Sequence, residues 1–291
     1  MKYETIRDDG LLANFYRPAT GDPRPGIIVI GGAGGGLDSA SAVAALLAER
    51  GYAALALAYF GLEHLPARLE EIPLEYFKTA IDWMWSQPSV TRDKTGIVGT
   101  SKGGEAALLI GAMYKEIGAV AAYSPSSVVF QGITEAWSDS STSKSSWTLR
   151  GKPLPFVPFR LDDKCLERYG FYLGLYLGSL RNTAAVKRAA IPVERINGPV
   201  LLATGTDDAI WPSTAMCHQI VERLRQQRFA FSFEHLSYEG AGHLLAGPNS
   251  LSPSRTVGAN GVNVGGTESA NAAARNDAWQ KVCAFFGAYL K

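Results

Sequence analysis

Residues 95–110 read TGIVGTSKGGEAALLI, and the pattern Gly-x-Ser-x-Gly occupies positions 99–103. The apolar residues before the pattern predict a buried strand, and the Ala/Leu-rich run after it predicts a helix. A serine on the sharp turn between the two is a nucleophile elbow, whose strained backbone lifts the hydroxyl out of the sheet. Gly99 and Gly103 suit this turn because a Cβ at either position would collide with the crossing strand and helix. We therefore predict that Ser101 is a nucleophile at a helix N-terminus, where developing negative charge is favoured.

Strand and helix signals alternate on both sides of this turn, which predicts a mostly parallel sheet with helices on both faces. Strands are expected at residues 11–17, 27–30, 52–58, 95–98, 119–123, 199–205 and 231–238. Helices are expected at residues 39–50, 73–87, from 104 onward, 212–227 and 276–290. The stretch 249–272 is rich in Gly, Ser and Asn, so we expect it to be irregular.

The composition predicts one domain. The chain has 291 residues, 46% of them hydrophobic, which suffices for a single α/β domain over residues 1–291. Residues 125–193 interrupt the alternation and are expected to form a cap-like insertion, the alternative being a long loop with one packed helix. Aromatic residues of this insertion are candidates for substrate binding, although aromatic side chains more often pack a core. The candidates are Phe156, Phe159, Phe171 and Tyr172.

Three features of the sequence indicate the expected partners and location of the protein: its charge, its N-terminal residues and its cysteines. The formal net charge is +1, from 28 basic and 27 acidic residues, so neither nucleic acid nor a membrane surface is an expected partner. The polar N-terminus lacks an apolar signal-peptide core, and no apolar run is long enough to span a bilayer. The three cysteines are scattered and predict reduced thiols. We expect a cytoplasmic protein with no metal or other cofactor.

A serine nucleophile needs a base, and the base needs an orienting carboxylate. His243 follows a predicted strand end far downstream of Ser101, which is where an α/β-hydrolase has its base. The other histidines are expected to be structural, because one precedes the elbow and two lie inside a predicted helix and a predicted strand. They are His64, His218 and His235.

The acid is expected in the turn after the predicted strand 199–205. Asp208 is preferred to Asp207 because it is the third residue after the glycine that ends the strand, where this turn typically presents the acid. Asp207 is then a turn or helix-capping residue. The resulting order Ser101, Asp208, His243 along the chain is that of the α/β-hydrolase fold, and we predict this fold with a catalytic triad.

Two backbone N–H groups are expected to form an oxyanion hole. One belongs to Lys102, the residue after the nucleophile, and the other to the glycine-rich loop 31–36, with Ala33 favoured and Gly34 next. Such a loop also resembles a dinucleotide-binding fingerprint, but a glycine-rich turn alone is a weak signal. The triad residues make the oxyanion role the preferred interpretation.

From about Leu11 to the C-terminus, the chain resembles the type I acyl-CoA thioesterases and the bile acid-CoA:amino acid N-acyltransferases. The resemblance is to their C-terminal, dienelactone hydrolase-like α/β-hydrolase domain. The segments that carry it occur in family order: PGII at 25–28, GGGL at 34–37, LALAYF at 55–60, LEYF at 74–77, GTSKGGE at 99–105, IPVER at 191–195, DD at 207–208 with Trp211, GH at 242–243 and DAW at 277–279. In the family, the nucleophile, acid and base correspond to Ser101, Asp208 and His243.

The chain departs from the family pattern in two ways. Larger members begin with a β-sandwich domain, for which these 291 residues leave no room, so the groups it contributes to CoA binding are not expected here. The amino-acid-conjugating members use cysteine as nucleophile, and Ser101 therefore favours hydrolysis. The resemblance implies a serine hydrolase that cleaves acyl thioesters through an acyl-enzyme. The Lys102 side chain is expected to be solvated at a helix start, the alternative being a contact with a CoA phosphate.

Other functions remain open beside acyl thioester hydrolysis. A carboxylesterase or dienelactone-type lactone hydrolase would use the same triad with different pockets. An acyltransferase to an amine or alcohol would need a site that binds the acceptor and excludes water. A hydrolase-fold protein that only binds is disfavoured, because all three triad residues are present. The expected partner is a small acyl thioester or ester, and the sequence does not indicate an oligomeric state.

Overall fold

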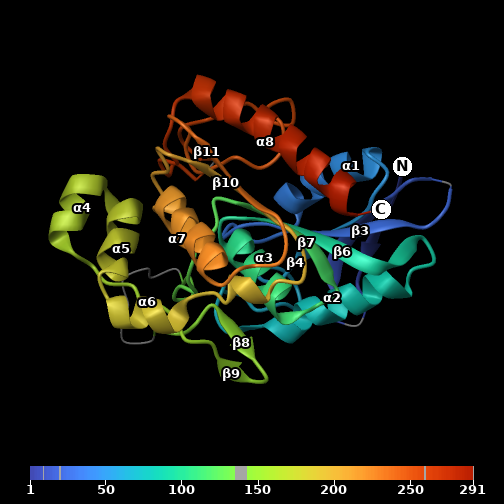
Figure 1. The fold of residues 1–291 in the computed structure, drawn as a ribbon, viewed down its shortest axis with the longest axis horizontal. Helices are drawn as coiled ribbons and strands as arrows, with labels where there is room; N and C mark the ends of the chain where they lie inside the picture. The colour runs from blue at the N-terminus through green and yellow to red at the C-terminus, as the bar shows by residue number, and fades with distance from the viewer. Residues whose placement is uncertain (9, 20, 135–142, 259, 291) are drawn as a thin grey trace.

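The computed structural model describes residues 1–8, 10–19, 21–134, 143–258 and 260–290. Eight strands form the central sheet: β1 (Lys2–Ile6), β2 (Leu12–Arg17), β3 (Arg24–Ile30), β4 (Ala53–Ala58), β6 (Val90–Thr100), β7 (Ile117–Tyr123), β10 (Val200–Gly205) and β11 (Phe233–Tyr238). Their spatial order is β1-β2-β4-β3-β6-β7-β10-β11 (Figure 1). The pairs from β4 to β11 are parallel, and the β1–β2 and β2–β4 pairs are antiparallel. The predicted mostly parallel sheet is confirmed.

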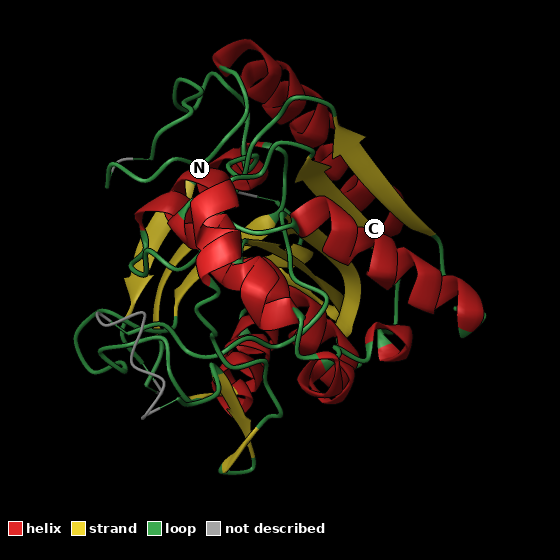
Figure 2. Ribbon diagram, turned by 90° about the vertical axis from the view of Figure 1, so that its left-hand side faces the viewer, coloured by secondary structure: helices red, strands yellow, loops and turns green. Residues whose placement is uncertain are grey.

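Helices cover both faces of this sheet (Figures 1 and 2). One face packs against α1 (Asp38–Glu49) and α8 (Glu268–Tyr289). The other packs against α2 (Leu74–Ser86), α3 (Lys102–Met113) and α7 (Ser213–Gln226). The central strands are buried on both sides, which explains their continuous apolar runs. Of the helices in the described ranges, none is long and apolar enough to cross a membrane.

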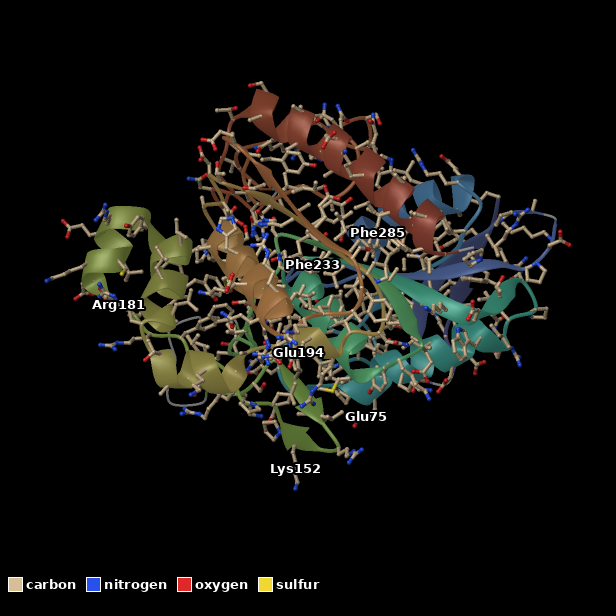
Figure 3. The ribbon with its side chains drawn as sticks, in the orientation of Figure 1. Glu75, Lys152, Arg181, Glu194, Phe233 and Phe285 are labelled. Carbon is tan, nitrogen blue, oxygen red and sulfur yellow. The ribbon has the colours of Figure 1, made fainter. Side chains whose placement is uncertain are left out.

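The segment that interrupts the alternation has its own small elements. They are β8 (Trp147–Leu149), β9 (Lys152–Pro153), α4 (Asp163–Tyr169), α5 (Phe171–Leu180) and α6 (Thr183–Ala189), followed by the 3-10 turn η2 (Val193–Arg195). β8 and β9 form a small sheet with β5 (Ile72–Pro73). Arg181, just after α5, and Lys152, on β9, lie at the outer margins of the inserted segment (Figure 3). An apolar cluster that includes Phe130 and Tyr176 packs this segment against Trp211 at the start of α7.

Outside the insertion, β1 and α8 differ from the sequence prediction, and β6 begins at Val90, five residues before its predicted start. β1 was not predicted because four of its five residues are exposed, so no buried alternation marks it. α8 begins at Glu268, eight residues before the predicted start, and this overturns the expected irregular structure of residues 268–272. The Thr267 side chain accepts a hydrogen bond from the N–H of Ala270, and this cap begins the helix.

The elbow is built from close backbone contacts. Ser101 has φ 57° and ψ −121°, a conformation that L-residues rarely adopt. A Cβ at Gly99 would lie 2.0 Å from the carbonyl oxygen of Gly103, and a Cβ at Gly103 would lie 2.2 Å from that of Gly31. The glycines are therefore required, because strand β6, helix α3 and the loop after β3 meet without room for a methyl group.

We expect Gly103→Ala to lower the free energy of unfolding by about 1–3 kcal/mol, because the atoms it would meet belong to the backbone. The matched control is Gly287→Ala in α8, where the new Cβ would meet only the Tyr52 hydroxyl at 3.8 Å. That change should be neutral or stabilise by up to about 1 kcal/mol through helix propensity. Urea unfolding of both variants measures the difference, and equal effects would contradict the packing argument.

Candidate active site

Three strand ends bring the predicted triad residues to one edge of the sheet. Ser101 follows β6, Asp208 lies in the turn after β10, and His243 follows β11. The carboxyl ends of parallel strands meet at the same edge, which is where ligands bind in open α/β sheets. Ser101 and His243 line the same cavity, whose volume is about 820 Å³.

Asp208 and His243 form a buried pair. His243 Nδ1 lies 2.8 Å from Asp208 Oδ2, and the two residues are only 3% and 6% exposed. The same carboxylate accepts hydrogen bonds from the Ser213 hydroxyl at 2.6 Å and from the backbone N–H groups of Ile210 and Trp211. These donors fix the carboxylate, and when Nδ1 carries the proton, Nε2 of the imidazole is left as a hydrogen-bond acceptor.

The neighbouring aspartate has a different environment. Asp207 is exposed, and its Oδ1 accepts a hydrogen bond from the Thr206 hydroxyl at 3.1 Å. Its backbone N–H donates to the carbonyl of Ala241. Asp208 is therefore the carboxylate in contact with His243, as its position in the turn predicts.

Further contacts hold the His243 backbone and ring. Its N–H donates to the carbonyl of Val264, and its own carbonyl accepts from the Ser124 hydroxyl at 2.8 Å. The Trp211 ring lies edge-on to the imidazole at 5.8 Å between centroids, and its Nε1–H donates to the carbonyl of Ser124. Ser124 and Ser213 could not be identified from the sequence, because no spacing rule predicts them. Trp211 was visible only as part of a family motif.

The other histidines lie outside the cavity wall. His64 and His218 are exposed. His235 Nε2 lies 2.7 Å from the Thr204 hydroxyl oxygen, and its ring is 5.2 Å from that of His218. Burial, with a smaller effect from His218, lowers the pKa of His235 to about 4. His235 is therefore neutral at neutral pH.

The expected oxyanion donors lie together beside the nucleophile. Lys102, Ala33 and Gly34 all line the cavity. Within the described residues, no hydrogen bond occupies the N–H groups of Ala33 and Gly34. The Tyr59 hydroxyl donates to the carbonyl of Gly31 at 3.0 Å, and this hydrogen bond anchors the start of the loop.

The Lys102 side chain is buried, so both expectations for it, a solvated residue or a CoA phosphate ligand, are wrong. It is 1% exposed, and its Nζ lies 2.6 Å from Glu105 Oε1 and 2.7 Å from the Ser146 hydroxyl. Trp147 Nε1–H donates to the same Glu105 oxygen at 2.7 Å. Burial lowers the pKa of Lys102 and raises that of Glu105, while each partner's charge opposes the shift of the other. The network joins the elbow helix to β8.

The aromatic candidates of the insertion separate into two groups. Tyr172 lines the cavity. Phe156 packs partly buried against the main core, Phe159 packs in the cluster around Phe130, and Phe171 is 44% exposed. Phe156 and Phe159 pack into apolar clusters and Phe171 lies on the exposed side of α5, so these three residues lie outside the cavity wall. Over the described ranges, no group of three or more His, Cys, Asp or Glu side chains is arranged to hold a metal ion.

Known proteins match this chain along its whole length. The family described as BAAT / acyl-CoA thioester hydrolase C terminal matches residues 72–291. Acyl-coenzyme A amino acid N-acyltransferase 1 of Mus musculus is 30% identical and aligns with 100% of this chain and 66% of its own length. Acyl-coenzyme A thioesterase 2 of Mus musculus, mitochondrial by name, is 32% identical over 97% of this chain and 59% of its own length. The chain thus spans less than two thirds of these relatives.

Solved structures share the fold. A dienelactone hydrolase-like promiscuous phosphotriesterase from metagenomic libraries superimposes with a TM-score of 0.59, at 16% identity, over 97% of this chain and 93% of its own. A dienelactone hydrolase from Anabaena variabilis gives a TM-score of 0.55, at 17% identity, over 100% and 99% of the two chains. At such identities the likeness concerns the fold alone, and it confirms the predicted α/β-hydrolase class.

Replacing the buried lysine should unfold the protein more easily. We expect Lys102→Met to lower the free energy of unfolding by about 3–5 kcal/mol, because Glu105 would keep a buried carboxylate without its cation. The double variant Lys102→Met/Glu105→Leu should recover most of that loss. Lys144→Met, which removes the exposed ion pair with Glu71, should cost less than about 1 kcal/mol. Urea unfolding measures the stability of all three variants. A Lys102→Met variant as stable as the wild type would contradict the burial argument.

The two aspartates should differ in their effect on Ser101. We expect Asp208→Asn to slow labelling of Ser101 by a fluorophosphonate by about 100-fold or more, because the imidazole loses its orienting anion. In Asp207→Asn, which changes the residue next to Asp208 in the same turn, Ser101 should be labelled at the wild-type rate. Similar rates for both variants would show that the contact with His243 does not activate the serine.

Proposed function

This chain belongs to the BAAT / acyl-CoA thioester hydrolase C-terminal family, and from that membership we propose that it is a serine hydrolase that cleaves acyl thioesters. The observation that carries the proposal is the buried Asp208–His243 pair on the cavity that Ser101 also lines. The names of the matching relatives, thioesterases and N-acyltransferases that act on acyl-coenzyme A, support an acyl thioester as the substrate.

In the first half-reaction, Ser101 Oγ attacks the acyl carbonyl carbon while His243 Nε2 takes the hydroxyl proton. Asp208 keeps the imidazole oriented and stabilises its charged form. The N–H groups of Lys102 and Ala33, with Gly34 as the alternative second donor, stabilise the oxyanion. When the tetrahedral intermediate collapses, the carbon–sulfur bond breaks, and the imidazolium gives its proton to the leaving thiolate.

In the second half-reaction, His243 removes a proton from water as the water oxygen attacks the acyl carbon. The ester bond to Ser101 Oγ then breaks, the imidazolium returns its proton to Oγ, and the carboxylic acid is released. A serine ester is readily released by water in this way, so Ser101 favours hydrolysis over transfer of the acyl group to an amine. An esterase or lactonase would use the same residues, and the choice among these reactions depends on the pockets around them.

The insertion is proposed to cover the site as part of a single domain. Ile133, Tyr172 and Tyr176 contribute to the cavity wall, so residues 125–193 supply one side of the substrate pocket. We retain the cytoplasm as the predicted location, although one matching thioesterase is mitochondrial by name.

The first test compares turnover of an acyl-CoA series with that of p-nitrophenyl esters of the same acyl groups. We expect CoA release by the wild type to exceed ester cleavage in kcat/KM, and Ser101→Ala to abolish both with folding intact. Asp207→Asn, in the exposed part of the acid turn, is the matched active control. Turnover that survives Ser101→Ala at the wild-type rate would overturn the mechanism, and ester cleavage with negligible CoA release would identify an esterase or lactonase.

A further inference from the structure

The cavity at Ser101 extends to one side into a groove that the proposed chemistry does not use. Its floor is formed by Val29 and Val98 of the sheet. One wall is α1, through Ser39, Ala40, Ala42 and Val43, and the other is formed by residues that follow His243, within 244–258 and 260–264. We call this space the α1 groove.

The α1 groove presents apolar side chains that folding has left uncovered. Leu244 is 45% exposed and Leu251 is 37% exposed, and both line the cavity. Val262 and Val264 continue the same wall. Large aliphatic side chains at the surface of a concave site mark a place where an apolar ligand binds, because covering them removes apolar area from water.

The outer wall of the groove is held in place from α8. Arg275 is 6% exposed, and its guanidinium donates to the carbonyls of Gly247 at 3.1 Å, Ser252 at 2.6 Å and Pro248 at 3.0 Å. Asn271 donates through Nδ2 to the carbonyl of Arg255 at 3.0 Å. These bonds anchor an irregular segment to a helix, so the groove is a formed feature of the fold.

The opposite side of the cavity is filled more completely. Tyr176 is 2% exposed and packs against Phe130 and Trp211, with ring centroids 4.8 Å and 5.2 Å away. The α1 side instead carries small residues, Ala40 and Ala42, facing the cavity. An extended chain that starts at the carbonyl carbon beside Ser101 therefore finds space along α1, which lines the cavity with Ser39, Ala40, Ala42 and Val43.

We propose that the α1 groove holds the acyl chain of the substrate, and that the small side chain of Ala42 sets the longest chain that fits. This inference rests on the proposed acyl thioester hydrolysis and adds the place and the length control of the acyl group. Each methylene that enters an apolar groove raises kcat/KM by up to about fourfold, so the preference for chain length reports how far the groove is filled.

The test measures the ratio of kcat/KM for palmitoyl-CoA to that for butyryl-CoA. Ala42→Phe should lower this ratio at least about tenfold, because the ring blocks the methylenes beyond the first few. The matched control is Ala45→Phe, which adds the same ring three residues further along α1 at a half-buried position outside the cavity wall, and should leave the ratio unchanged. Circular dichroism and thermal melting check folding, and Ala42→Leu serves as a milder change with a smaller shift.

The possible outcomes are distinct. Ser101-dependent turnover with an unchanged ratio in both Ala42 variants would overturn the inference and leave the proposed function standing. If the ratio falls in Ile133→Phe and not in the Ala42 variants, the acyl chain lies on the insertion side of the cavity, and this result would also overturn the inference. Absence of Ser101-dependent CoA release from the wild type would overturn the proposed function, and the inference with it.

Discussion

The close contact between helix α3 and the loop after β3 is the constraint on which the site depends. Gly103 lies against the carbonyl of Gly31 so closely that no Cβ fits between them. This contact fixes two things together: the strained backbone of Ser101 and the position of the loop that carries Ala33. The proposed nucleophile and the proposed oxyanion donor, from distant parts of the chain, are thereby placed without any flexible side chain between them.

A second constraint lies on the other side of the elbow helix. The buried Lys102–Glu105 pair, with Trp147 and Ser146, ties the elbow to the inserted segment through hydrogen bonds of 2.6 to 2.7 Å. Such a pair adds little net stability, because desolvation opposes the attraction, but breaking it is costly. Its effect is to fix one arrangement of the insertion relative to the nucleophile, so that the cavity wall formed by the insertion keeps its position.

Sequence reasoning succeeded where the signal is local. The elbow needs glycines at fixed spacings, and the parallel strands need continuous apolar runs, so the fold class and the positions of Ser101, Asp208 and His243 could be predicted. It failed where partners come from distant segments. The burial of Lys102 depends on Ser146 and Trp147, and the absence of Phe171 from the cavity wall depends on which side of α5 faces the cavity. Neither relation leaves a periodic pattern in the sequence.

The central claim is that the acyl group passes through a covalent ester on Ser101. The most direct measurement is intact-protein mass spectrometry of the wild type quenched within milliseconds of mixing with an acyl-CoA, followed by peptide fragmentation. We expect a mass increase equal to the acyl group less one hydrogen, located on Ser101 and absent from Ser101→Ala. CoA release without any acylated protein, or an acyl group on another residue, would contradict it.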